Sequence, residues 1–202
     1  MNGFDFDNTI YKGDSSFDFY FYCLRKRPKI LLSLPYQSFS FLLYALRLIN
    51  KTQFKECFYT YFKRLGDTDA LAEGFWDKKF CRIKSFYLDL RCDDDVIISA
   101  SPEFLLRIPC EKLGVGCLIA SEVDKSTGKY AGLNCHGREK LRRFREKYGS
   151  ERFERFYSDS LSDFPLAEIA ERSFIVKGSD ITDWQEYAAK HAKQAKRSKR
   201  KR

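Results

Sequence analysis

The sequence is poor in histidine and in paired cysteines, and each shortage excludes a class of chemistry. Only two histidines occur among the 202 residues, His136 and His191. A Ser–His–Asp or Cys–His catalytic group would rest on His136 alone, and no matching nucleophile motif lies near it. The seven cysteines contain no CxxC pair and their number is odd. Both facts argue against a zinc site and against a secreted disulfide framework.

The sequence also lacks a signal-peptide pattern and a strong charge on its folded part. The start, MNGFDFDN, shows no basic stretch followed by an apolar one, so we expect a cytoplasmic protein. The formal net charge is +9, but residues 188–202 hold eight Lys or Arg and no acid, which leaves +1 for residues 1–187. That balance disfavours a globally basic nucleic-acid module. We expect residues 188–202 to be a disordered basic tail, with contact to an anionic membrane or RNA left open.

Aromatic residues are abundant, and 14 of the 33 lie between residues 17 and 62 at helical spacing. Residues 11–85 are therefore predicted to be an all-helical insert. Residues 30–49 include 14 apolar residues of 20, but Pro35, Gln37 and Arg47 interrupt them, which disfavours a membrane-spanning helix. Two interpretations stay open for this stretch. It packs within the insert, or it forms an amphipathic surface that docks on anionic lipid.

Short apolar strands alternate with helices outside the insert. Strands are predicted at 2–6, 96–99, 118–123, 153–158 and 174–176. Helices are predicted at 102–113, 138–148 and 165–172, and a last one from about 181. This alternation predicts an α/β fold whose parallel sheet has helices on both faces.

Four groups of polar residues lie where ligands bind in such a fold, outside the carboxyl ends of the strands. They are Asp5 with Asp7, Ser99 to Ser101, Lys140, and Asp159 with Asp163. Carboxylate oxygens suit Mg²⁺, and a lysine with hydroxyls and free N–H groups suits a phosphoryl group. Asp5 and Asp7 are two apart, so an extended backbone points both side chains the same way. One carboxylate can then attack phosphorus while the other protonates the leaving oxygen.

These motifs resemble those of the haloacid dehalogenase superfamily of phosphohydrolases. DFDNT resembles motif I, IISAS motif II, the Lys140 region motif III and DSLSD motif IV. The helical insert is similar to the C1 cap of subfamily IB, which includes phosphoserine phosphatases and phosphatidylglycerophosphatase C-type enzymes. The resemblance implies a Rossmann-like core of residues 1–10 and 86–187 and a C1 cap of residues 11–85, with residues 188–202 as the tail.

The resemblance also implies a Mg²⁺-dependent phosphatase that forms an aspartyl-phosphate, with a role for each motif residue. Asp5 would be the nucleophile and Asp7 the general acid/base, and both would bind Mg²⁺ together with Asp159. Asp163 would orient a metal-bound water or Lys140. The phosphate-binding residues would be Thr9, Ser99, Ala100, Ser101 and Lys140, with the choice between Ser99 and Ser101 as the motif II ligand left open.

The substrate implied by the resemblance is a small phosphorylated metabolite or a lipid phosphate. Asp14 falls where phosphoserine-specific relatives have a glutamate that faces the substrate, and its shorter side chain leaves phosphoserine specificity open. The alternative is a catalytically weak phosphatase-like adaptor that binds anionic lipid or RNA through the insert and the basic tail.

Overall fold

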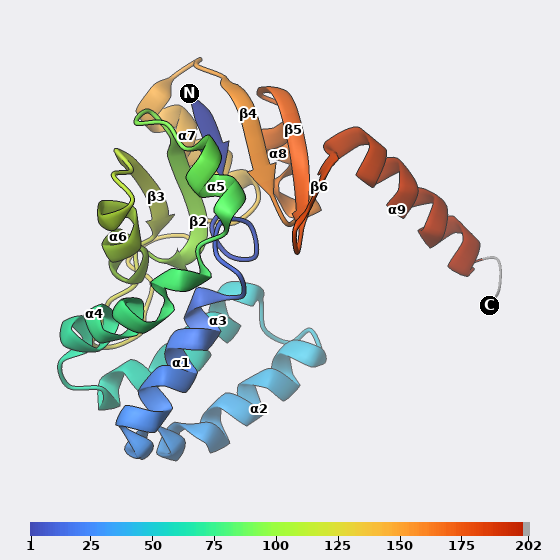
Figure 1. The fold of residues 1–202 in the computed structure, drawn as a ribbon. Coiled ribbons are helices and arrows are strands. Elements are labelled where there is room, and N and C mark those ends of the chain that lie inside the picture. The colour runs from blue at the N-terminus through green and yellow to red at the C-terminus, as the bar shows by residue number, and fades with distance from the viewer. Residues whose placement is uncertain (200–202) are drawn as a thin grey trace.

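A six-stranded sheet lies at the centre of the molecule, with its strands in the order β3-β2-β1-β4-β5-β6 (Figure 1). The computed structural model describes residues 1–199, with side chains through residue 192. The strands are β1 (Asn2–Phe4), β2 (Val96–Pro102), β3 (Cys117–Ser121), β4 (Phe153–Ser158), β5 (Ala170–Lys177) and β6 (Asp180–Asp183). The first five run parallel, and β6 pairs antiparallel with β5. The predicted α/β class with a mainly parallel sheet is confirmed.

Helices bury both faces of this sheet, which explains why the central strands are apolar without alternation. Consecutive residues point to opposite sides, so Ile97 and Tyr157 join one buried cluster while Ile98 and Phe156 join the other. The first face is covered by α5 (Ser85–Leu90) and α6 (Glu103–Lys112). The second is covered by α7 (Arg138–Tyr148), α8 (Phe164–Ala167) and the start of α9 (Trp184–Lys199).

Between β1 and β2 the chain forms a helical segment that lies at the carboxyl end of the parallel strands (Figure 1). Its helices are α1 (Ser15–Lys26), α2 (Leu34–Ala45), α3 (Lys51–Tyr59) and α4 (Thr68–Lys79), with 3-10 turns at Pro28–Ser33, Thr60–Arg64 and Phe80–Arg82. Its interior is aromatic, and the rings of Phe19 and Phe75 meet edge to face at 5.5 Å. Trp76 Nε1 donates a 2.6 Å hydrogen bond to the carbonyl of Leu105 in α6, which joins the segment to the sheet layer.

The two stretches of chain that connect this segment to the sheet lie side by side. Tyr11 and Ile83 form an antiparallel bridge. On either side of it, the Lys12 amide donates to the carbonyl of Arg82 (2.9 Å) and the Lys84 amide donates to the carbonyl of Ile10 (2.8 Å). The entry and the exit of the helical segment are thus paired through their backbones.

The structure corrects the predicted elements near the C-terminus. The helix predicted at 165–172 ends at Ala167, because Ala170 and Arg172 pair with β4 and begin a long strand. The hairpin strand β6 was missed, and the last helix begins at Trp184 instead of near 181.

Helix α9 runs through residues 188–199 of the stretch predicted to be a basic tail, while residues 200–202 lie outside the described residues. The Asp183 carboxylate accepts the amide of Gln185 at the start of α9, and alanine, lysine and glutamine are strong helix formers. None of the helices within residues 1–199 combines the length and the apolarity needed to cross a bilayer.

Candidate active site

The buried side chain of Lys140 connects the motif around Asp5 with the motif around Asp163. Lys140 lies in the first turn of α7, and its Nζ is 2.6 Å from Asp5 Oδ1 and 2.7 Å from Asp163 Oδ2. The relative exposure of Lys140 is 2%, that of Asp163 is 2% and that of Asp5 is 7%. Ser158, the last residue of β4, donates a 2.8 Å hydrogen bond to the same Asp163 oxygen. Asp163, expected to orient a metal-bound water or Lys140, thus contacts Lys140 directly.

The second acid of motif I is held by two other elements. Asp7 Oδ1 accepts the backbone amide of Ser15 at 2.6 Å, at the start of α1. Its Oδ2 accepts the hydroxyl of Ser101 at the end of β2. The Ser101 amide in turn donates to Ser99 Oγ at 3.1 Å, and the Ser101 hydroxyl lies 3.1 Å from that of Ser16. Ser99 and Ser101 therefore share one network, and the Ser101 hydroxyl is the one that contacts the acid.

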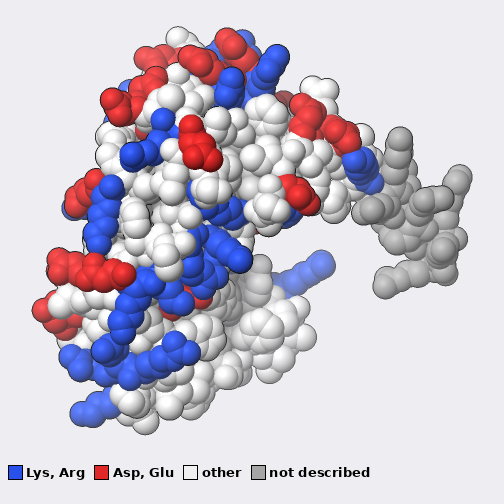
Figure 2. All heavy atoms as spheres, viewed as in Figure 1, with Lys and Arg blue, Asp and Glu red and all other residues white. Residues whose placement is uncertain are grey.

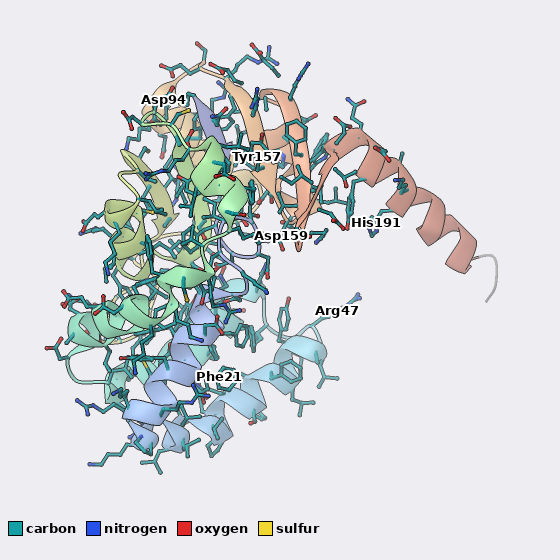
Figure 3. The ribbon with its side chains drawn as sticks, viewed as in Figure 1. Phe21, Arg47, Asp94, Tyr157, Asp159 and His191 are labelled. Carbon is teal, nitrogen blue, oxygen red and sulfur yellow. The ribbon has the colours of Figure 1, made fainter. Side chains whose placement is uncertain are left out.

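The remaining predicted residues surround these two groups. Thr9 is fully buried, and its hydroxyl donates a long 3.4 Å hydrogen bond to Asp5 Oδ2. Ala100 is half-buried at the end of β2. Asp159 follows β4 directly and is half-buried, and Figure 3 shows it at the end of the sheet that faces the helical segment. Asp14 accepts the amide of Phe17 at 3.0 Å and so caps the N-terminus of α1.

Burial and like charges shift the ionisation of the acids. Burial raises the pKa of Asp5 to about 7, with the Lys140 charge opposing the rise and the Asp163 and Asp159 charges adding to it. Burial, reinforced by the nearby Asp14, raises the pKa of Asp7 to about 6. Burial also raises the pKa of Asp159. For Lys140, burial lowers the pKa, but Asp5 and Asp163 outweigh it, and the net pKa is raised. Lys140 is therefore protonated at neutral pH.

Two cations of α3 face this site, and the sequence analysis did not single them out. Lys55 Nζ donates a 2.8 Å hydrogen bond to the carbonyl of Ala100. Burial lowers the pKa of Lys55 to about 8, against the opposing charges of Asp14 and Asp7. Burial lowers the pKa of Lys51, against the opposing charge of Asp163. The only signal in the sequence was their spacing of four, which puts both on one helix face.

The donor set at the carboxyl ends of β1 and β4 fits a hard divalent cation. It offers the carboxylates of Asp5 and Asp159, whose oxygens are donors of the kind that Mg²⁺ prefers. The mutual repulsion of Asp5 and Asp159 is the interaction that a cation between them would relieve.

A tighter group of potential ligands within the described residues lies elsewhere. It consists of Cys92, Asp94 and Asp95 in the loop before β2. This loop stands at the opposite end of the strands from Asp5, and the Asp94 carboxylate is paired with the N-terminal ammonium at 2.9 Å. It does not belong to the candidate active site.

Comparisons with known proteins identify a matching family and solved structures with the same fold. The family model described as haloacid dehalogenase-like hydrolase matches residues 3–168. A solved structure of a protein with unknown function from Bordetella pertussis Tohama I is 18% identical, with 86% of this chain and 87% of that chain covered and a TM-score of 0.65.

Two further solved structures share the fold. A HAD family hydrolase from Salmonella enterica serovar Typhi is 14% identical, with 84% of this chain and 59% of that chain covered and a TM-score of 0.53. A phosphoserine phosphohydrolase-like protein from Francisella tularensis subsp. tularensis SCHU S4 is 19% identical, with 85% and 84% covered and a TM-score of 0.53. No curated protein matches the sequence. At these identities the structural likenesses show the fold alone.

Proposed function

The chain belongs to the haloacid dehalogenase-like hydrolase family, and from this premise we propose that it is a Mg²⁺-dependent phosphomonoester hydrolase that acts through an aspartyl-phosphate. The observation that carries the proposal is the buried contact of Lys140 with both Asp5 and Asp163, which unites three motifs at the carboxyl ends of the strands. A fixed cation beside a buried carboxylate is the arrangement that phosphoryl transfer requires.

The contacts of Asp5 assign different tasks to its two oxygens. Oδ1 accepts a hydrogen bond from Lys140, whereas the hydrogen bond that Oδ2 accepts within the described residues is the long one from the Thr9 hydroxyl. Oδ2 is therefore the oxygen proposed to attack phosphorus in line with the leaving group. The Lys140 ammonium would neutralise charge on the equatorial oxygens of the transferring group, and hydroxyls and amides from Ser99 to Ser101 would hold those oxygens.

Asp7 is placed to move protons. Its raised pKa lets a fraction of the side chain carry a proton near neutral pH, and that proton would go to the leaving oxygen. The resulting carboxylate would then take a proton from the water that attacks the aspartyl-phosphate. The hydrogen bonds from Ser15 and Ser101 fix the direction in which Asp7 points during both steps.

Asp5, Asp159 and the main-chain carbonyl of Asp7 would hold Mg²⁺. When bound, the ion would offset the charge of the phosphoryl oxygens and of the crowded carboxylates.

The helical segment of residues 11–85 is proposed to act as a C1 cap of the subfamily IB type. It is inserted directly after the motif I strand, it lies over the carboxyl end of the sheet, and its helix α3 brings Lys51 and Lys55 to the acids. A cap of this kind excludes water during phosphoryl transfer and selects the substrate. The substrate is proposed to be a small phosphorylated metabolite or a lipid phosphate. Asp14, which caps α1 beside Asp7, is proposed to face the leaving group.

The nucleophile is tested by the change Asp5→Asn, which keeps the shape and removes the attacking oxygen. Turnover of p-nitrophenyl phosphate in Mg²⁺ should fall by about 10⁴-fold or more, and trapping of a phosphoenzyme analogue with beryllium fluoride should disappear. Asp77→Asn, at an exposed acid of α4 outside the site, is the matched control and should keep full turnover. EDTA should silence the wild-type protein, and added Mg²⁺ should restore it.

Retention of more than a tenth of the wild-type turnover by Asp5→Asn, with Asp77→Asn unchanged, would show that another group attacks phosphorus. Near-ultraviolet circular dichroism of both variants separates loss of chemistry from loss of folding.

A further inference from the structure

Exposed apolar side chains are concentrated on one short stretch of the surface. Of the 17 large apolar residues that are exposed in the described part of the chain, ten lie between residues 31 and 48. Leu32 and Leu48 are each 67% exposed, Phe41 is 62% exposed and Leu46 is 60% exposed. Single exposed apolar residues are ordinary on a protein surface, but a contiguous group of this size marks a binding surface.

Helix α2, at the centre of this stretch, has its polar side inward. The residues that it buries are Gln37 and Ser40. Gln37 Nε2 donates a 2.7 Å hydrogen bond to the carbonyl of Phe58, and the Ser40 hydroxyl donates to the carbonyl of Gln37. A surface helix that packs on a protein core and otherwise meets only water has the reverse arrangement, with its apolar side buried and its polar side outward. Packing within the helical segment accounts for only part of the apolar surface of α2, because Tyr44 stacks on Phe54 of α3 at 4.9 Å while Phe41 and Leu42 stay more than half exposed.

The stretch of chain around this face carries positive charge. No Asp or Glu occurs from residue 19 to residue 55. The exposed cations of this stretch are Arg25, Lys26, Arg27, Lys29, Arg47 and Lys51. Figure 2 shows the surface over α2, at the lower right, without red atoms, and Arg47 extends from the tip of this region in Figure 3.

A groove between α2 and α3 continues the apolar surface inward. Its volume is about 860 Å³, and its walls include Tyr36, Phe39, Leu43 and Ile49. Lys63, Arg64 and Lys129 also line it, together with the acid Glu56. The groove thus combines apolar walls with positive charge, as the whole face does.

We propose that the apolar face formed by residues 31–48, with its surrounding cations, docks on the surface of an anionic lipid bilayer. Leucine and aromatic side chains enter the acyl boundary, and arginine and lysine side chains contact the anionic headgroups, as in interfacial amphipathic helices. A second copy of this chain fits less well, because a symmetric contact would bring two groups of cations together. The proposal concerns a surface outside the catalytic residues, and it does not depend on the proposed phosphatase activity.

The test is co-sedimentation of the full chain with vesicles of phosphatidylcholine, alone or with about a third phosphatidylglycerol. The wild type should bind the anionic vesicles and release them at high salt. The triple variant Leu32→Ser/Leu46→Ser/Leu48→Ser should bind at least tenfold more weakly. Leu133→Ser, at a 65% exposed leucine outside the face, is the matched control and should bind like the wild type. All variants keep the basic C-terminal residues, so a difference among them belongs to residues 31–48.

A charge variant separates the two parts of the surface. Arg25→Glu/Lys26→Glu/Lys29→Glu should lose binding to the anionic vesicles, whereas Arg152→Glu/Arg155→Glu, on the exposed side of the sheet layer, should not. Turnover of p-nitrophenyl phosphate without vesicles should be the same in all these variants, so failure of docking is distinguishable from failure of the proposed chemistry. Wild-type binding of the triple serine variant would overturn the proposal. So would a wild-type dimer that the serine variant abolishes, because the face would then join two copies.

Discussion

Replacement of Lys140 by methionine tests the buried ion pairs that Lys140 forms with Asp5 and Asp163. Methionine keeps most of the aliphatic stem and removes the charge that lies between Asp5 and Asp163. These two carboxylates are buried, and each lies within 2.7 Å of the Lys140 ammonium. Removal of one partner from a buried ion pair costs about 3–5 kcal/mol of unfolding free energy. For a chain of this size that loss corresponds to a fall in Tm of about 6–20 °C.

The pH dependence of this loss has a defined sign. Burial already holds the pKa of Asp5 at about 7 in the presence of Lys140, above its ordinary value, and removal of the cation raises that pKa further. The folded state then binds more protons than the unfolded state, so stability is retained at low pH and lost as the pH rises through the folded pKa. The Lys140→Met variant should therefore be destabilised less at pH 5 than at pH 8.

Urea denaturation at both pH values, in EDTA, measures the effect. Lys147→Met, at an exposed lysine of the same helix, should change the unfolding free energy by less than about 0.5 kcal/mol. Adding Asp163→Asn to Lys140→Met should recover part of the loss at pH 8, since one unpaired charge is removed. The buried ion pair is refuted if the unfolding free energy of Lys140→Met at pH 8 stays within about 0.5 kcal/mol of the wild type. It is also refuted if the variant loses the same unfolding free energy at both pH values.

Two further predictions concern the acid and the junction between layers. Asp7→Asn should lower turnover of an alkyl phosphate by about 10²–10⁴-fold while p-nitrophenyl phosphate, whose leaving group needs no proton, still gives a burst of nitrophenolate. In the wild type, the alkyl phosphate reaction should slow as the pH rises above about 6, where Asp7 loses its proton; equal loss of the burst for both esters would refute the role. Gly128 has a φ of +77°, and a Cβ there would lie 2.3 Å from the carbonyl oxygen of Tyr59. Gly128→Ala should therefore lower the free energy of unfolding in urea clearly more than Gly149→Ala, a position with a similar φ and open space, where the loss should be about 1–2 kcal/mol. Similar losses for the two variants would mean that the Tyr59 contact is loose.

Periodicity sufficed where an element has a clear buried side. The helix predicted at 138–148 and the strand predicted at 153–158 match α7 and β4. In α7, Leu141, Phe144 and Tyr148 recur at helical spacing between charged residues. Strand β6 was missed because DITD has no such pattern, and its extended form comes from pairing with β5. For the same reason the start of β5, AER, was assigned to a helix.

The convergence of the acids was predictable, but the contribution of the helical segment was not. Order along the chain and position at strand ends brought Asp5, Lys140 and Asp163 together, since parallel strands end at one edge of the sheet. The hydrogen bond of Lys55 to that edge, and the nearness of Lys51, depend on how α3 is oriented over the sheet, which local sequence does not encode. The inward polar side of α2 likewise emerges only when burial is known for each residue.

The backbone pairing of residues 10–12 with residues 82–84 has a mechanical consequence. Two paired connections resist twisting better than two separate single strands, so any displacement of the helices they carry would have to bend this short ladder. Helix α1, the first helix of the segment, begins at Ser15, whose amide donates a hydrogen bond to the Asp7 carboxylate. Any displacement of the helical segment about the ladder would therefore also displace the Asp7 side chain.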